Sequence, residues 1–284
     1  MLDEFFRFIS KSHKHPGTAI DKHYLEEIFL INLLLVTFGS LVLLTRKGTP
    51  NGAEDENVIL RKDFAGKDIH LCSFLNNICN TATAAMNLIK QGYDTQARIL
   101  IRTLDERIYQ CMVLFASSED YENWGKAEEQ EDAKQAHYDL FSRKGRILKR
   151  VSELEEKYLG LSDHKNEIQA WRKERESYYS MAVHGAASAV LIGSASFALE
   201  DDSAHIPNLF GIPSSASSGT LSHMIYQLHG LLLLLPEILN DVHGWHPTVE
   251  DELERIYLAT SGAATILVRQ WILEKNSRDS SPEQ

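Results

Sequence analysis

A stretch without a single charge, Ile28 to Leu44, constrains the fold of this chain more than any other. Two glutamates precede it, and Arg46 and Lys47 follow it. A membrane-spanning helix needs about 20 apolar residues, whereas this shorter stretch also contains polar Asn32 and Thr37. We therefore interpret it as a buried core helix, with a membrane span as the alternative.

The composition favours a helical protein. Among 284 residues, 43% are hydrophobic and 24% are charged, and the chain has only seven prolines and sixteen glycines, which is few for an all-β protein of this length. The net charge of −11 argues against general binding to a phosphate backbone and favours solubility. A local basic patch remains compatible with binding to RNA.

The cysteines indicate a reducing compartment. The chain has three cysteines, Cys72, Cys79 and Cys111, which is an odd number and includes no CxxC pair. A framework of disulfides is therefore not expected. The N-terminus has acidic residues before its apolar positions and no small-residue cleavage site, unlike a signal peptide. We expect a cytoplasmic protein.

Helical periodicity recurs along the chain and strand alternation does not, which predicts an all-α antiparallel bundle of about seven to nine helices. We expect Gly92 to end one helix and Asp94 to cap the next. The predicted helices of the first half are 3–12, 19–45, 68–91 and 94–117, with a loop over 47–57.

The second half begins with a charge-polarised segment. Residues 119–135 are strongly acidic, and 143–150 carry five positive charges, which is typical of solvated helices that pair with one another, or of a basic patch for RNA or a partner. Later helices are predicted over 163–196, 220–240 and 248–276. We expect one domain over 1–276, with a charged helical arm at about 118–150 and a disordered tail at 277–284.

The helix predicted over 94–117 carries a polar stripe. At 100° per residue, Arg98, Arg102, Asp105 and Tyr109 share one side and Glu106 lies at its edge. Guanidinium groups, carboxylates and a phenol suit the binding of a phosphate or carboxylate, or a buried salt network. An ordinary exposed helix also supplies such i,i+4 pairs, so both interpretations stay open.

A histidine follows paired tyrosines in the stretch "RESYYSMAVHGAASAVLIG". The small residues beside His184 suit close approach of another helix, and imidazole is available there as an acid or base. The alternative is a packing histidine bonded to a backbone carbonyl or to Asp105 or Glu106. Tyr178 and Tyr179 are candidates for positioning a ligand or substrate.

Two segments, Ala97 to Tyr109 and Tyr178 to Ser188, resemble a widespread family of uncharacterised bacterial all-helical proteins. More distantly, the arrangement is similar to HEPN domains, helical bundles of toxin and antiviral systems. The resemblance implies a metal-independent ribonuclease in which His184 acts with Arg102 and Arg98. The Arg-x4-6-His motif of HEPN nucleases is absent before His184, because the preceding arginine is Arg175.

The sequence predicts no metal site and no cofactor. The C-terminal third contains His223, His229, His243 and His246, but His223 and His229 face different sides of a helix and the last two lie in a turn. A Gly-rich phosphate loop, a nucleophile elbow and an HExxH motif are all missing.

Two functional hypotheses follow from these observations. The first is a soluble helical binding or regulatory protein of a bacterial defence or toxin system, with a protein partner or self-association through its apolar helices. The alternative is a HEPN-like ribonuclease acting on RNA. A weaker third hypothesis makes 28–44 the membrane anchor of an effector.

Overall fold

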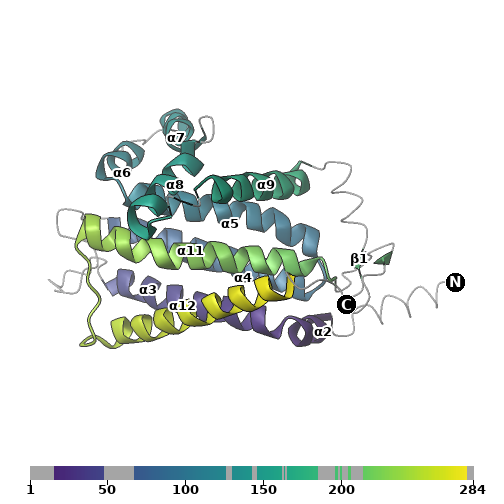
Figure 1. Ribbon diagram of the computed structural model, residues 1–284. Helices are drawn as coiled ribbons and strands as arrows, with labels where there is room; N and C mark the ends of the chain where they lie inside the picture. Colours follow the sequence, from purple (N-terminus) through teal and green to yellow (C-terminus); the bar gives the residue numbers. More distant parts are fainter. Residues whose placement is uncertain are drawn as a thin grey trace. The chain divides into compact units, whose positions relative to one another are not determined.

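The structure, a computed structural model, is all-α (Figure 1). It describes residues 16–47, 67–125, 130–142, 146–161, 163, 165–184, 196–197, 199, 204–205 and 214–279. The helices of the first half are α2 (Pro16–His23), α3 (Leu25–Lys47), α4 (Lys67–Lys90), α5 (Asp94–Phe115), α6 (Ser118–Gly125) and α7 (Gln130–His137). A π-helical turn, η2 (Tyr138–Ser142), precedes α8 (Arg146–Leu159), α9 (Lys165–Val183), α11 (Ser217–His243) and α12 (Glu252–Asp279).

The fold class predicted from the sequence is confirmed. The described residues contain ten α-helices rather than seven to nine, because the charged arm divides into α6, α7 and α8 and the first apolar helix is interrupted at Tyr24. A short antiparallel ribbon pairs β1 (Ser196–Phe197) with β2 (Ala204–His205). The helix predicted over 3–12 lies wholly outside the described residues. Of the loop predicted over 47–57, only Lys47 is described, and it is the last residue of α3.

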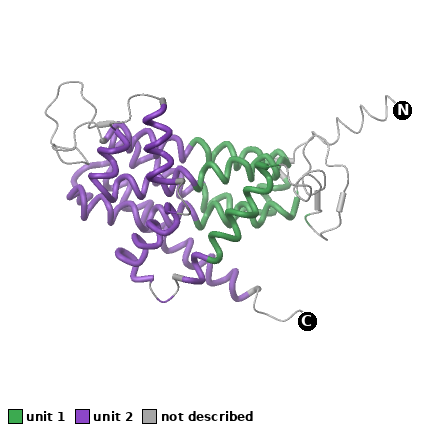
Figure 2. Tube along the Cα trace, turned by 90° about the horizontal axis from the view of Figure 1, so that it is seen from above, with its two compact units in different colours: residues 1–31, 80–105, 170–226 green, residues 32–79, 106–169, 227–284 purple. Residues whose placement is uncertain are grey.

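The chain forms two compact units (Figure 2). Unit 1 comprises residues 1–31, 80–105 and 170–226, and unit 2 comprises 32–79, 106–169 and 227–284. Helices α3, α4, α5, α9 and α11 contribute residues to both. The sequence alone suggested one continuous domain with an arm.

The turn between α4 and α5 belongs to unit 1 and depends on Gly92. Its φ is 81°, a left-handed conformation that closes the last turn of α4 through bonds from Gly92 N–H to the Ile89 carbonyl and from Tyr93 N–H to the Leu88 carbonyl. The prediction for Gly92 is therefore confirmed. Asp94 is the first residue of α5 rather than its cap, and its side chain accepts hydrogen bonds from Thr220 and Arg98.

Unit 1 joins its helices through an apolar core and polar contacts at its edge. The Tyr24 hydroxyl donates to the Ser215 carbonyl at 3.0 Å, and Lys90 pairs with Asp21 at 2.8 Å. The core residues are fully buried members of α2, α3, α4, α5 and α11, namely Ile20, Ile31, Ile89, Ile101, Leu104, Leu221, Met224 and Ile225.

The arm helices of unit 2 bury aromatic side chains rather than standing free in solvent. Tyr121 of α6 is buried and hydrogen-bonds to His70 of α4, and its ring lies 5.8 Å from that of Phe115 in α5. Arg150 of α8 pairs with Asp120 of α6. Pairing within the arm therefore occurs as expected, but buried aromatic contacts also attach the arm to α4 and α5.

Helices α11 and α12 follow one another across a turn at Gly244, whose φ is 68°. His243 hydrogen-bonds to the Phe115 carbonyl at 2.9 Å, and the rings of Trp245 and Tyr257 lie 5.4 Å apart. Helix α12 extends to Asp279, beyond the predicted end at 276, and residues 280–284 lie outside the described part.

Two helices are long and apolar enough to cross a membrane by length and composition, Leu25–Thr45 and Glu252–Ser277. The first has 56% of its apolar window buried and the second 22%. Core helices of soluble proteins pass the same test, so these features alone place neither helix in a membrane. Helix α3 buries Ile31, Leu34 and Phe38 but exposes Phe29 and Val36.

We expect Gly92→Ala to lower the free energy of unfolding by about 1 kcal/mol, because alanine disfavours a left-handed φ. Gly230→Ala is the matched control. Gly230 lies inside α11, where an added Cβ meets no atom within 4 Å, so this change should be neutral or stabilise by up to about 1 kcal/mol. Urea unfolding measures both, and equal losses would contradict the role given to Gly92.

His229 makes the stability of unit 2 depend on pH. Its side chain is 7% exposed, and burial, aided by Arg269, lowers its pKa from 6.5 to about 4. As pH falls from 6.5 toward 4, the unfolded chain binds a proton that the folded chain resists, so stability falls in that window. The expected loss between pH 7.5 and 5 is about 2 kcal/mol.

His229→Leu should remove this part of the pH dependence. Chemical unfolding of wild type and variant at pH 7.5 and 5 isolates the contribution of His229, because all other titrating groups are common to both. Identical pH profiles would show that His229 takes up its proton with its ordinary pKa in the folded protein.

Candidate functional site

The polar stripe predicted on α5 faces the interior of unit 1. Arg98 and Asp105 are only 5% and 4% exposed, and Arg102 is half-buried. Their partners come from α5 itself, α9 and α11. Charged groups are seldom buried unless they are paired, so the partners determine what the stripe can do.

Arg98 is held by groups from three helices. Its Nη2 lies 2.6 Å from the Asp94 carboxylate one turn earlier in α5, and the other oxygen of Asp94 accepts a hydrogen bond from the Thr220 hydroxyl of α11 at 2.9 Å. The guanidinium also lies 4.8 Å from the ring centre of Tyr178 in α9. This stacking and ion pairing fix the orientation of the guanidinium.

Asp105 pairs with His223 of α11 in the interior of unit 1. The Nε2 atom of His223 lies 2.9 and 3.0 Å from the two carboxylate oxygens and donates, because an ionised carboxylate can only accept. The imidazole packs against the rings of Tyr179 and Trp171, with centroids 4.7 and 5.4 Å away. These rings fix the plane of the imidazole.

Tyr179 places a phenol hydroxyl among these charges. Its side chain is fully buried. Burial raises the pKa of the hydroxyl above its ordinary value, the negative charge of Asp105 raises it further, and the positive charge of Arg175 opposes the rise. Tyr179 therefore keeps its proton near neutral pH and can act as a donor.

The edge of the site is formed by half-buried residues of α5 and α9. Arg102 donates to Glu176 at 3.0 Å, and Arg175 lies 5.9 Å from the ring centre of Trp171. Arg175 makes no ion pair with any described residue. One arginine side chain beside the interior thus carries a positive charge that no carboxylate of the described residues neutralises.

Several buried nitrogen and oxygen atoms of this site have no hydrogen-bond partner among the described residues. They are Arg98 Nε, Arg175 Nε, Tyr179 Oη and His223 Nδ1. Buried polar atoms in folded proteins are nearly always bonded, and an unsatisfied one costs about 1–3 kcal/mol. The described residues thus gather three donors in one region, on Arg98, Arg175 and Tyr179, without supplying acceptors for them.

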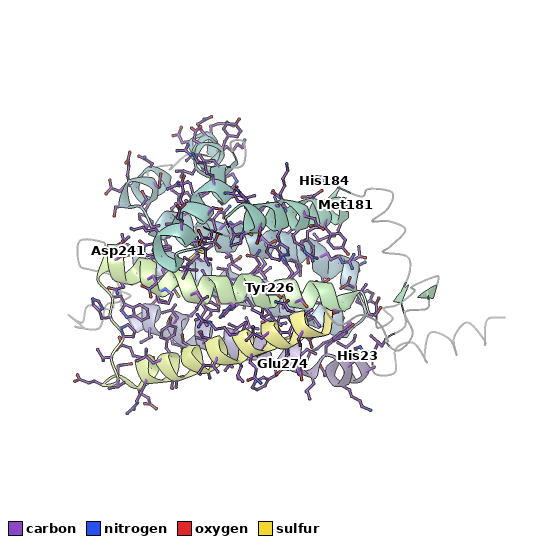
Figure 3. The ribbon with its side chains drawn as sticks, in the orientation of Figure 1. His23, Met181, His184, Tyr226, Asp241 and Glu274 are labelled. Atoms are coloured by element: carbon purple, nitrogen blue, oxygen red, sulfur yellow. The ribbon has the colours of Figure 1, made fainter. Side chains whose placement is uncertain are left out.

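The remaining residues predicted from the sequence lie elsewhere. His184 follows α9 and is exposed, as Figure 3 shows at the end of that helix. Of the two carboxylates expected as its partner, Asp105 is bonded by His223 instead and Glu106 is exposed. The reason is that α9 directs Tyr179, and not His184, into the interior. Residues 185–195, the rest of the predicted helix, lie outside the described part.

Two further residues of the predicted stripe belong to unit 2. Glu106 is exposed. Tyr109 is 5% exposed, and its hydroxyl accepts a hydrogen bond from Gln227 of α11 at 2.9 Å. The stripe therefore does not act as one continuous surface.

The contributions of α11 and of Trp171 and Glu176 in α9 were not predicted from the sequence. A signal was present in α11, since Thr220, His223 and Gln227 are spaced three and four residues apart. Such spacing places them on one face. The described residues contain no group of three or more histidines, cysteines or carboxylates arranged to hold a metal ion.

Residues 68–191 match the model of a family of unknown function (DUF5677). The matched segment includes α4 to α9, and with them Arg98, Asp105 and Tyr179, whereas His223 of α11 lies beyond it. No curated protein and no solved structure shows significant similarity to this chain.

His184, the candidate from the sequence, and His223, which the structure places beside Asp105, should differ in how much their substitution destabilises the protein. His223→Ala should lower the free energy of unfolding by about 3 kcal/mol, because it leaves Asp105 buried without its partner. His184→Ala should change it by less than about 0.5 kcal/mol, because the side chain is exposed. Urea unfolding monitored by circular dichroism measures both.

The double variant Asp105→Asn/His223→Ala is the control for this comparison. It removes the buried charge together with its partner, so it should be more stable than His223→Ala alone. A His184→Ala variant that is as unstable as His223→Ala would contradict the assignment of His223 as the structural histidine.

Proposed function

We propose that this protein is a helical binding protein whose site among α5, α9 and α11 of unit 1 holds a small anion that carries a phosphate or carboxylate group. The observation that carries the proposal is the set of buried donors without acceptors, on Arg98, Arg175 and Tyr179. The oxygens of an anion supply the missing acceptors.

The two carboxylates of the site support this proposal rather than oppose it. Asp94 holds one terminal nitrogen of Arg98, while the Nε–H donor of the same guanidinium has no partner among the described residues. Asp105 holds His223 through Nε2 and so fixes the ring against which Tyr179 packs. Asp94 therefore fixes the guanidinium of Arg98 through one atom and leaves another donor of the same group available. Such orientation in advance lowers the ordering cost of binding.

The charge of the site also suits an anion. Arg98 and Arg102 pair with Asp94 and Glu176, whereas Arg175 has no carboxylate partner among the described residues. In a region shielded from water, a guanidinium interacts strongly with phosphate or carboxylate and can bind it through two parallel hydrogen bonds. We place this binding in a sensing or regulatory role of a bacterial defence or toxin system, following the sequence resemblance.

The ribonuclease alternative has less support. Arg102 pairs with Glu176 of α9, and His184 lies eight residues further along, roughly 12 Å along the helix axis. Arg102 thus engages α9 two turns before the histidine with which it was expected to act. Arg98 is directed to Asp94 and Tyr178.

Tyr179→Phe gives the sharpest test of the binding site. Removing a buried hydroxyl that has no partner should leave the ligand-free protein equally stable or more stable, by up to about 1 kcal/mol. The same change should weaken anion binding about tenfold, the effect of losing one hydrogen bond to a charged group. Urea unfolding and isothermal titration with inorganic phosphate and with citrate, at ionic strength held constant with chloride, measure the two quantities.

Arg175→Gln should weaken binding at least as strongly, because it removes the unneutralised charge. Lys173→Gln is the matched control, since it removes one positive charge from the exposed side of the same helix and should leave affinity unchanged. Equal weakening in both variants would indicate nonspecific attraction and overturn the proposal. The proposal would also be overturned if the protein bound no anion but cleaved RNA in the presence of EDTA, and if this cleavage were lost in His184→Ala.

A further inference from the structure

Helix α12 of unit 2 buries only a narrow stripe of its surface against its own chain. The buried residues are Tyr257, Ala264, Val268 and Trp271, at intervals of seven, four and three residues, which is the width of a coiled-coil seam. A core helix of a globular protein usually buries a wider face. A large part of α12 is therefore left to solvent.

A second apolar stripe runs along the exposed side of the same helix. Ile256, Ile266 and Leu273 are 41%, 67% and 70% exposed, and Ala259, Ala263 and Gln270 between them are also exposed. The six positions alternate in steps of three and four residues, the repeat that keeps apolar side chains on one seam. No charged residue occurs between Arg255 and Arg269.

We propose that this exposed stripe of α12 is a homodimer interface, on which α12 of a second copy of the chain packs antiparallel. The stripe is self-complementary in that arrangement. A register that places Ala263 opposite the partner's Ile266 also places Ile256 opposite the partner's Leu273, and Ala259 opposite the partner's Gln270. Every position of the stripe then meets another position of the stripe, as a two-fold interface requires.

The size of the side chains fits this register. Each small alanine meets a larger residue of the partner, so the two helices can approach closely without leaving voids. In the middle of the seam, Ala263 and Ile266 form two equivalent layers related by the two-fold axis. The large residues Ile256 and Leu273 close the seam at both ends.

The charges of α12 select the antiparallel arrangement over the parallel one. The segment that begins the helix is acidic, with Glu250, Asp251, Glu252 and Glu254 against Arg255, a net charge of −3. The second half carries Arg269, Lys275 and Arg278 against Glu274 and Asp279, a net charge of +1. Figure 3 labels Glu274 near the far end of the helix. Antiparallel packing brings each acidic start alongside the partner's second half, whose net charge is positive, whereas parallel packing would bring the acidic starts together.

This inference is independent of the anion site, because α12 lies in unit 2 and none of its residues contributes to that site. A lipid surface is the competing occupant, since α12 is also apolar enough to pass a length and composition test for a membrane span. The test must therefore separate a second copy from lipid.

The experiment measures the mass of the full chain by size-exclusion chromatography with light scattering, without detergent. We expect wild type to be dimeric, and Ile256→Lys and Leu273→Glu each to shift the dissociation constant at least a hundredfold toward monomer. The double variant Ile256→Lys/Leu273→Glu should recover the dimer, because lysine then faces the partner's glutamate. In a parallel pair, lysine would face lysine and glutamate would face glutamate, so the double variant would stay monomeric. That result would overturn the proposed antiparallel register.

Val249→Lys is the matched control. Val249 is 66% exposed, nearly the same as Ile266, but precedes α12, so this variant should stay dimeric. Circular dichroism should show all variants folded, because the substituted side chains are exposed. A monomeric wild type, or wild type that sediments with phosphatidylcholine and phosphatidylglycerol vesicles and loses this in Ile256→Lys, would overturn the proposal.

Discussion

The pair formed by Asp105 and His223 underlies the interior of unit 1, because a carboxylate that is only 4% exposed needs a donor to remain there. His223 of α11 meets this need, although it lies 118 positions after Asp105 in the sequence. Once the pair is formed, the rings of Tyr179 and Trp171 pack against the imidazole. The positions of α5, α9 and α11 in unit 1 are thus linked through one ionic hydrogen bond.

The interior of unit 1 contains more donors than the described residues satisfy. Arg98 and Tyr179 are buried as deeply as the apolar core, yet each retains a polar atom without a described partner. Natural folds keep such atoms where an interaction compensates for them. This is the physical reason for proposing a ligand in unit 1. It is also why loss of the Tyr179 hydroxyl should weaken anion binding without destabilising the ligand-free protein.

Much of the helical organisation follows from local sequence signals. Gly92 ends α4 because only a residue without a Cβ adopts its φ without strain, and the apolar run near Ile28 forms a helix because nothing interrupts it. The polar stripe of α5 was also predictable, since 3.6 residues per turn place Arg98, Arg102 and Asp105 on one side. The sequence could not predict whether that stripe faces solvent or the interior, because burial depends on helices that are distant in sequence.

The sequence by itself therefore determined the all-α class, the turns at glycines and the residues that share a helix face, since these depend on neighbours within a few positions. Only the tertiary structure decided which histidine meets Asp105. His184 follows the conspicuous tyrosines but ends exposed after α9, whereas His223 lies within an apolar helix and is buried. Periodicity fixes the direction of a side chain on its own helix, but the partner that it meets depends on how separate helices pack.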